Sequence, residues 1–210
     1  MRSTSTHNLI LNALFVALVL LLGMTPIGMI PLGAINVTIL HIPVIAGTLF
    51  LGLKSGLLLG FFFGLCSALS AFGLTLTPPS ALAAALGNES PFLFLIMCFV
   101  PRLLVPTITW LIHDALLSVN KHFSTAVAAA FGSVTNTVFY LSLMIVFYNL
   151  AGFNVNELLH SLGIHGLNFF GVIGVIAGGA GGLEALAAFL IVPPIVAALG
   201  KAKKQTYWSN

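Results

Sequence analysis

Long stretches with almost no charge constrain the fold of this chain more than any other feature. A helix needs about 20 apolar residues to cross the hydrocarbon core of a bilayer. Apolar stretches broken by proline, glycine or charge cover residues 9–23, 39–53, 55–74, 92–117, 124–150 and 167–199. Charged residues make up 5% of the chain, whereas about a quarter of a typical soluble domain is charged. We therefore expect one all-α domain over residues 1–210, an integral membrane six-helix bundle.

The basic residues predict the orientation of this bundle. Lys and Arg are enriched in cytoplasmic loops and ends. Six of the seven basic residues fall on one predicted face, namely Arg2, Lys54, Lys121, Lys201, Lys203 and Lys204. Glu89 and Glu157 fall on the other face. We expect a multi-pass protein with both termini in the cytoplasm, and we interpret the basic C-terminal segment as a lipid headgroup anchor, so no nucleic-acid partner is expected.

Two ionisable residues lie inside apolar stretches. Arg102 is flanked by Pro101 and Pro106, and Glu184 follows a glycine run. Charge at membrane depth is costly, so such residues commonly face a cavity and contact a partner or ligand. The alternatives are a structural ion pair between the two, or a side chain that reaches the membrane interface. The pair predicts a polar site within the bilayer.

Glycine is dense directly before Glu184, where Gly178, Gly179, Gly181 and Gly182 occur. Glycine inside a helix costs roughly 1 kcal/mol relative to alanine and lets the backbone unwind or approach a ligand. Broken helices at membrane depth line cavities, and their freed backbone groups bind substrate. We expect Gly178 and Gly181 to contribute to the site, and tight packing against a neighbouring helix is an equal alternative.

Small residues at intervals of four predict where helices approach one another closely. Gly52, Gly56, Gly60 and Gly64 form such a row in the third stretch, and Ala68 continues it. Rows of this kind let neighbouring backbones pack together, so we interpret this one as structural.

Further polar residues occur within or beside the apolar stretches. Asn136 has an amide that both donates and accepts, and Tyr140 follows one turn later on the same helix face. Asn36, Thr38 and His41 cluster where the first outer connection meets the second stretch. All five are candidate ligand contacts. Interhelical hydrogen bonds are the alternative for Asn136 and Tyr140, and a helix start is the alternative for His41.

Enzyme signatures are missing from the sequence. His113 and Asp114 are adjacent, so on a helix they point in different directions. No H-E-x-x-H or G-x-S-x-G motif occurs, and Cys66 and Cys98 lie in apolar runs without a metal-binding pattern. We expect no enzymatic activity and no metal, with an intramembrane enzyme as the less favoured alternative. No ATP-binding loop is present either, so any energy-coupling machinery would have to come from partners.

Several segments carry a family resemblance that extends from about Asn8 to Leu199. They are TILHIPVIAG from Thr38, LGLKSGLLLG from Leu51, FGLCS from Phe63, FVPRL from Phe99, SVTNT from Ser133, Glu184 with Pro193 and Pro194, and the pair Ala13 and Ala17. Together they resemble the substrate-binding S components of energy-coupling factor (ECF) vitamin transporters, most closely the pantothenate-type members.

The resemblance implies a six-helix bundle in a bacterial cell membrane that captures a water-soluble vitamin outside, beneath the first outer loop. The bundle then topples and releases the vitamin inside. The implied partners are a transmembrane coupling subunit, which docks on Ala13 and Ala17, and two ATPase subunits that bind ATP. No cofactor is implied in this chain itself. A secondary transporter is the other alternative, although no inverted repeat is evident.

The substrate prediction depends on the two ionisable residues. The planar guanidinium of Arg102 suits a carboxylate, and Glu184 can accept hydrogen bonds from hydroxyl or amide groups. This combination favours pantothenate. Folate or riboflavin would need flat aromatic surfaces, and Phe72 and Tyr140 are the rings that would stack on hydroxymethylpyrimidine or pyridoxine, which stay as alternatives.

Overall fold

Helices dominate the computed structural model, which describes residues 2–31, 36–152, 157, 159–160, 163 and 169–208. In chain order they are α1 (Arg2–Met24), α2 (His41–Leu51), α3 (Leu53–Ala71), α4 (Ala81–Glu89), α5 (Pro91–Leu116), α6 (Lys121–Leu150), α8 (Phe169–Val175), the π-helical segment η1 (Ile176–Gly181) and α9 (Gly182–Trp208). Strands β1 (Met29–Pro31) and β2 (Asn36–Thr38) form one antiparallel hairpin. The predicted all-α class is confirmed.

Four helical stretches are long and apolar enough to cross a membrane. They are Leu53–Ala71, Pro91–Leu116, Lys121–Leu150 and Phe169–Lys201. Two shorter apolar helices, Asn8–Met24 and His41–Leu51, correspond to the first and second predicted spans. The number of six membrane crossings stays a prediction.

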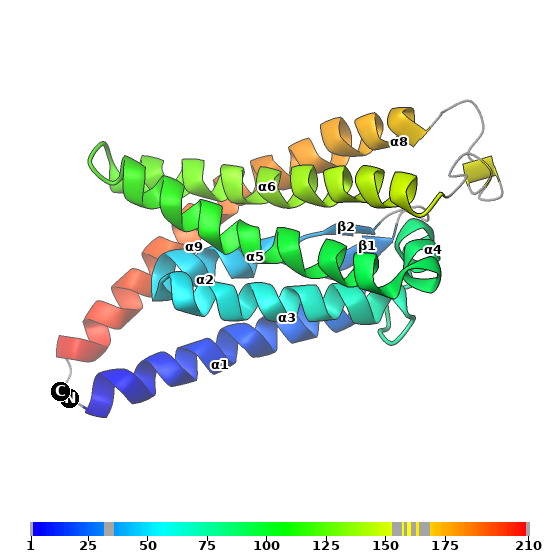
Figure 1. The fold of residues 1–210 in the computed structure, drawn as a ribbon. Coiled ribbons are helices and arrows are strands. Elements are labelled where there is room, and N and C mark those ends of the chain that lie inside the picture. Colours follow the sequence, from blue (N-terminus) through cyan, green and yellow to red (C-terminus); the bar gives the residue numbers. More distant parts are fainter. Residues whose placement is uncertain are drawn as a thin grey trace.

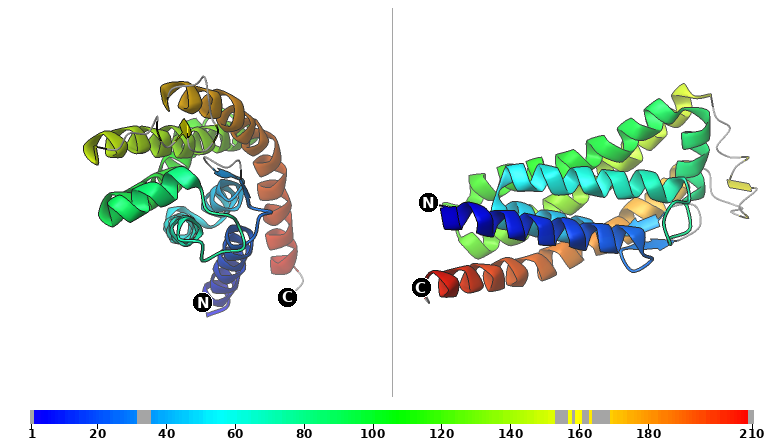
Figure 2. Two further views of the ribbon diagram at one scale, coloured as in Figure 1. Left: turned by 90° about the vertical axis from the view of Figure 1, so that its right-hand side faces the viewer. Right: turned by 90° about the horizontal axis from the view of Figure 1, so that it is seen from below.

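The long helices lie side by side, and the two ends of the bundle differ in character (Figures 1 and 2). α1 begins and α9 ends at one end of the bundle, whereas the hairpin and α4 lie at the opposite end. The first turns of α3 and α6, which contain Lys54 and Lys121, lie at the same end as the termini. The predicted grouping of these basic residues therefore agrees with the arrangement of the helices.

The glycine row of α3 lies against α5. A Cβ atom added to Gly60 would lie 2.5 Å from the carbonyl oxygen of Arg102, and one added to Gly64 would lie 2.8 Å from the ring of Phe99. Neither position has room for a larger residue unless the backbone or a ring moves. The row therefore lets α3 approach α5 beside Arg102, as its spacing predicts.

The helices differ from the predicted apolar stretches in two places. Gly52 separates α2 from α3 and adopts φ 95°, a conformation that favours glycine, whereas the predicted stretches are separated at Lys54. The segment between the predicted stretches 55–74 and 92–117 contains α4. Ser80 caps this helix by accepting a hydrogen bond from the N–H of Ala83 at 3.3 Å, and an alanine-rich run follows.

Side-chain hydrogen bonds stabilise the β1–β2 hairpin and join it to another part of the chain. The Thr38 hydroxyl donates to the carbonyl of Gly28 at 3.2 Å and accepts from the N–H of Leu40 at 3.1 Å. The Asn36 amide donates to the carbonyl of Pro78 at 3.1 Å, which joins β2 to the segment before α4. These contacts position the hairpin over the space between α3, α5, α6 and α9.

Candidate functional site

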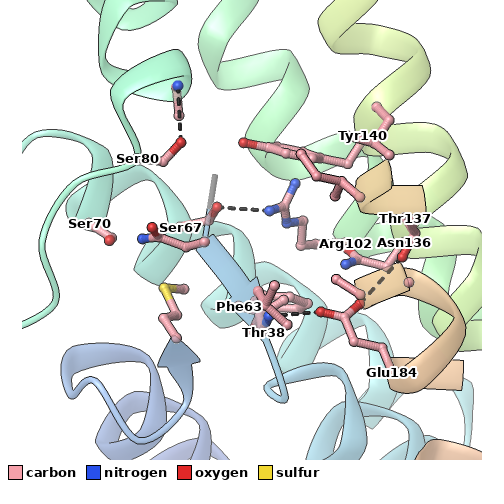
Figure 3. Close-up of a pocket in the computed structure, with 18 of the residues that line it drawn as sticks. Thr38, Phe63, Ser67, Ser70, Ser80, Arg102, Asn136, Thr137, Tyr140 and Glu184 are labelled. Carbon is pink, nitrogen blue, oxygen red and sulfur yellow. Dashed lines mark hydrogen bonds between the residues drawn. The ribbon is translucent and has the colours of Figure 1, made fainter. Parts of the chain in front are cut away.

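A pocket is lined by residues of the hairpin and of α3, α5, α6, η1 and α9 (Figure 3). The space between its lining residues is about 680 Å³, a volume that includes open solvent. Its polar and charged lining includes Thr38, Ser67, Ser70, Arg102, Asn136 and Glu184.

Most of the predicted substrate-binding residues meet in this pocket. Seven of the ten line it, namely Asn36, Thr38, Arg102, Asn136, Tyr140, Gly181 and Glu184. They come from β2, α5, α6, η1 and α9, so residues distant in the sequence form one site.

The other three predicted residues are not among the lining residues of the pocket. His41 is fully buried at the first residue of α2, as the helix-start alternative suggests. Phe72 follows the last residue of α3, is 49% exposed and packs edge-on against Phe94 with ring centroids 5.2 Å apart. Gly178 is exposed and has open space where its Cβ would be. Whether a residue near these helix ends faces the pocket depends on how each helix is rotated about its axis.

Arg102 is held in place by a carbonyl group that a proline leaves free. Pro101 lies inside α5 and has no N–H, so it cannot make the helical hydrogen bond to the carbonyl of Met97. Nη1 of Arg102 donates to that carbonyl at 3.0 Å, and Nη2 donates to Oγ of Ser67 at 2.9 Å. Pro101 therefore creates the acceptor that orients the neighbouring guanidinium.

The guanidinium of Arg102 also lies between two aromatic rings. Its Cζ atom is 4.3 Å from the ring centroid of Tyr140 and 5.2 Å from that of Phe63. Arg102 is only 4% exposed, and its hydrogen-bond and ring partners within the described structure are all neutral. Aromatic faces and carbonyls stabilise a cation without cancelling its charge, so the side chain stays able to bind an anion.

Glu184 contacts two other elements at the far side of the pocket. Oε1 accepts a hydrogen bond from the N–H of Thr38 at 2.8 Å, and Oε2 accepts one from the hydroxyl of Thr137 at 3.4 Å (Figure 3). No ion pair joins Glu184 to Arg102, both of which the structure describes. The alternative in which these two residues neutralise each other directly is therefore not what the structure contains.

The glycine run before Glu184 does not interrupt the helix. Ile176–Gly181 forms a π-helical segment between α8 and α9, so the backbone stays helical with a wider turn. Gly181 packs tightly, because its Cβ would lie 2.7 Å from Cγ2 of Thr137, whereas Gly179 and Gly182 have open space around them. The expected unwinding is not present, and the packing alternative applies to Gly181.

Comparison with known proteins identifies the family. The sequence model of the ECF transporter substrate-specific component matches residues 7–196. The chain belongs to this family. The pantothenic acid transporter PanT of Lactococcus lactis subsp. cremoris (strain MG1363) is 30% identical to this S component over 175 residues, which cover 80% of each chain. The predicted resemblance is confirmed, and with its long apolar helices this S component is a multi-pass membrane protein.

Some pocket residues of this S component were not predicted from its sequence. Phe63, Ser67 and Ser70 line the pocket from one face of α3, and Thr137 lines it from α6. The spacing of Phe63, Ser67 and Ser70 is that of neighbours on one helix face, and this shared face, rather than any single hydroxyl, was the available signal.

The predicted docking residues of this S component lie outside the pocket. Ala13 and Ala17 are exposed on α1, next to the exposed side chains of Leu14 and Leu18. This face of α1 has no neighbour within the described chain at those side chains, so a partner helix has access to it. Docking at these alanines stays a prediction.

Proposed function

We propose that this S component binds pantothenate, with the carboxylate at Arg102 and the hydroxyl and amide groups toward Glu184 and Asn136. The observation that carries the proposal is the buried guanidinium of Arg102, which has neutral hydrogen-bond partners and lines a pocket with several polar groups. A ligand carboxylate could bind this guanidinium through short, charge-assisted hydrogen bonds. The similarity to a pantothenic acid transporter supports the same substrate.

The aromatic residues favour an aliphatic ligand over a flat ring. One face of Tyr140 is covered by the guanidinium of Arg102, and Phe72 lies outside the pocket against Phe94. These were the two rings expected to stack on hydroxymethylpyrimidine or pyridoxine. A flexible acid with hydroxyls and an amide needs hydrogen bonds rather than stacking, and the described lining offers several polar groups for this purpose.

The proposed transport cycle places the pocket on the outer side of the membrane. The hairpin and α4 would face outward, and both termini would be cytoplasmic, because Lys54, Lys121 and Lys201 lie at the terminal end of the bundle. Release inside would follow toppling of the bundle, driven by a transmembrane coupling subunit and two ATPases that bind ATP. The exposed face of α1 around Ala13 and Ala17 would dock on the coupling subunit.

Titration calorimetry on the detergent-purified chain tests the substrate. The panel contains pantothenate, hydroxymethylpyrimidine, pyridoxine, folate and riboflavin, and the variants are Arg102→Ala, Arg102→Lys and, as a control, Lys54→Ala. We expect tight binding of pantothenate alone and a loss of roughly 100-fold or more in Arg102→Ala, because a buried charged hydrogen-bonding partner is removed. The pantothenate affinity of Arg102→Lys should lie between those of the unmodified chain and Arg102→Ala, since lysine keeps the charge but not the planar guanidinium.

Other results would overturn specific parts of the proposal. Tight binding of a different vitamin would contradict pantothenate while keeping the family function. Unchanged affinity in Arg102→Ala would contradict the carboxylate contact. Failure of every vitamin to bind would favour the intramembrane enzyme alternative. Co-purification of the chain with ATPase subunits tests the proposed partners independently of the ligand.

A further inference from the structure

Several threonine hydroxyls of this protein bond to their own backbone. Thr48 donates to the carbonyl of Val44 at 2.7 Å, and Thr135 donates to that of Phe131 at 2.7 Å. Thr25, Thr107 and Thr125 make the same bond to the carbonyl four residues earlier. This bond satisfies a hydroxyl in an apolar environment without help from another helix. A buried helical hydroxyl that lacks it requires an explanation.

Within the described helices, Ser70, Thr109 and Ser133 lack this bond, and of these three residues only Ser70 lines the pocket. Its side chain is 2% exposed, and its Oγ atom has no hydrogen-bond partner among the residues that the structure describes. A hydrogen-bond partner is present for each of the other serine and threonine hydroxyls described in the lining, which are those of Thr38, Ser67, Ser80 and Thr137. A buried hydroxyl without a partner costs free energy, so a group entering the pocket gains by bonding to it.

Arg102 has an unused donor in the same pocket. Its Nη1 and Nη2 atoms donate to Met97 and Ser67, but Nε is buried and has no partner in the described structure. Ser67 and Ser70 are three residues apart on α3, so they share one face of that helix. Figure 3 shows both serines on the same side of Arg102. This end of the pocket therefore combines a positive charge with unsatisfied donors.

The opposite end of the pocket combines a negative charge with an unsatisfied acceptor. Glu184 is a carboxylate, and the nearby Oδ1 atom of Asn136 is a buried acceptor without a partner among the described residues. A ligand carboxylate placed there would face a second negative charge and an unsatisfied acceptor, whereas ligand hydroxyl and amide hydrogens would find acceptors.

We infer that Ser70 is a substrate-contacting residue that binds the carboxylate of the ligand together with Arg102. Ser70 thereby determines specificity for an acid over a neutral analogue, and the inference rests on the proposed binding of a vitamin acid in this pocket. A carboxylate has about four lone-pair positions, so it can accept from the guanidinium and from the serine hydroxyl at the same time. The contact also sets the direction in which the ligand lies, with its acid end toward α3.

A comparison of an acid with its neutral analogue tests this contact. Calorimetry on the purified chain would use pantothenate and the alcohol in which a hydroxymethyl group replaces the carboxylate. We expect Ser70→Ala to weaken pantothenate binding roughly 10- to 100-fold, the effect of losing a hydrogen bond to a charged group, and to weaken binding of the alcohol much less. Thermal unfolding of the variant reports whether the fold is retained.

Ser133→Ala provides a matched control. Ser133 is also fully buried with a hydroxyl that has no partner in the described structure, but it does not line the pocket. Its removal should leave both affinities unchanged. Equal losses for acid and alcohol in Ser70→Ala, or no loss for either, would overturn the carboxylate contact.

The same experiment separates this inference from the choice of vitamin. If the unmodified chain binds a different vitamin acid, and Ser70→Ala removes its preference for that acid over the neutral analogue, the Ser70 contact stands and pantothenate is wrong. If pantothenate binds and Ser70→Ala has no effect, the vitamin stands and the contact is wrong. If no carboxylic acid binds, both are wrong.

Discussion

Glu184 on α9 accepts a hydrogen bond of 2.8 Å from the backbone N–H of Thr38 on β2. The two residues are 146 positions apart in the chain, and both are buried, with exposed fractions of 7% for Thr38 and 8% for Glu184. This bond ties the hairpin that covers the pocket to the helix that carries the pocket carboxylate. Glu184 therefore supports the structure of the site in addition to its proposed role with the ligand.

Replacement of Glu184 should loosen the hairpin to a degree that depends on the new side chain. Glu184→Ala leaves the buried N–H of Thr38 without an acceptor, which costs about 1–3 kcal/mol. Glu184→Gln retains an amide oxygen that can accept the same bond, so the hairpin should stay close to its original stability. Hydrogen exchange at the Thr38 amide measures the difference. Equal exchange in Glu184→Ala and the unmodified chain would show that the bond does not hold the hairpin.

Gly181 should be intolerant of a larger side chain. In Gly181→Ala the new Cβ would lie 2.7 Å from Cγ2 of Thr137, so η1 and α6 would have to separate and the Thr137–Glu184 hydrogen bond would weaken. Overpacking of this kind typically costs about 1–3 kcal/mol. We expect a lower unfolding temperature and weaker ligand binding. Gly178→Ala is the matched control, because Gly178 has open space around it.

Pro101 should influence ligand affinity although it is not part of the pocket lining. Pro101→Ala restores an N–H that can bond to the carbonyl of Met97 and so competes with Nη1 of Arg102. A displaced guanidinium should lower pantothenate affinity about 10-fold while the helix stays folded. Pro194→Ala, at an exposed proline within α9, is the control. Calorimetry of both variants checks this, and unchanged affinity in Pro101→Ala would contradict it.

The exposed face of α1 should matter for coupling and not for binding. Ala13→Leu with Ala17→Leu adds bulk to a surface on which a partner helix would pack closely. We expect less co-purification with the coupling subunit and unchanged vitamin affinity. Ala115→Leu, at an exposed position near the end of α5, controls for added bulk elsewhere. Equal co-purification of the double variant and the control variant would argue against docking at this face.

The charged parts of the pocket could be predicted from the sequence because of the solvent that surrounds this chain. A charge in hydrocarbon is costly, so Arg102 and Glu184 were informative as single positions, before any packing was known. Asn136 and Tyr140 are uncharged, but as polar side chains on one helix face within an apolar stretch they were also predicted, and both line the pocket.

Hydroxyls carry much less information in a sequence. A serine or threonine in a helix can bond to its own backbone at little cost, so Ser67, Ser70 and Thr137 gave no signal of their own. Helix rotation was a second source of error. Phe72 and Gly178 lie near pocket residues in the sequence, but neither lines the pocket. The side chain of Phe72 is exposed, and Gly178 borders open space.

Features that depend on the bilayer and on local covalent structure follow from the order of the amino acids alone. These include the helical class, the close approach of α3 to α5 through glycine, and the free carbonyl of Met97 that follows from Pro101. In contrast, the packing of the helices gives Arg102 and Glu184 different hydrogen-bond partners instead of each other. That outcome depends on how far apart the packed helices hold the two side chains, and this distance is set by contacts between residues that are remote in the chain.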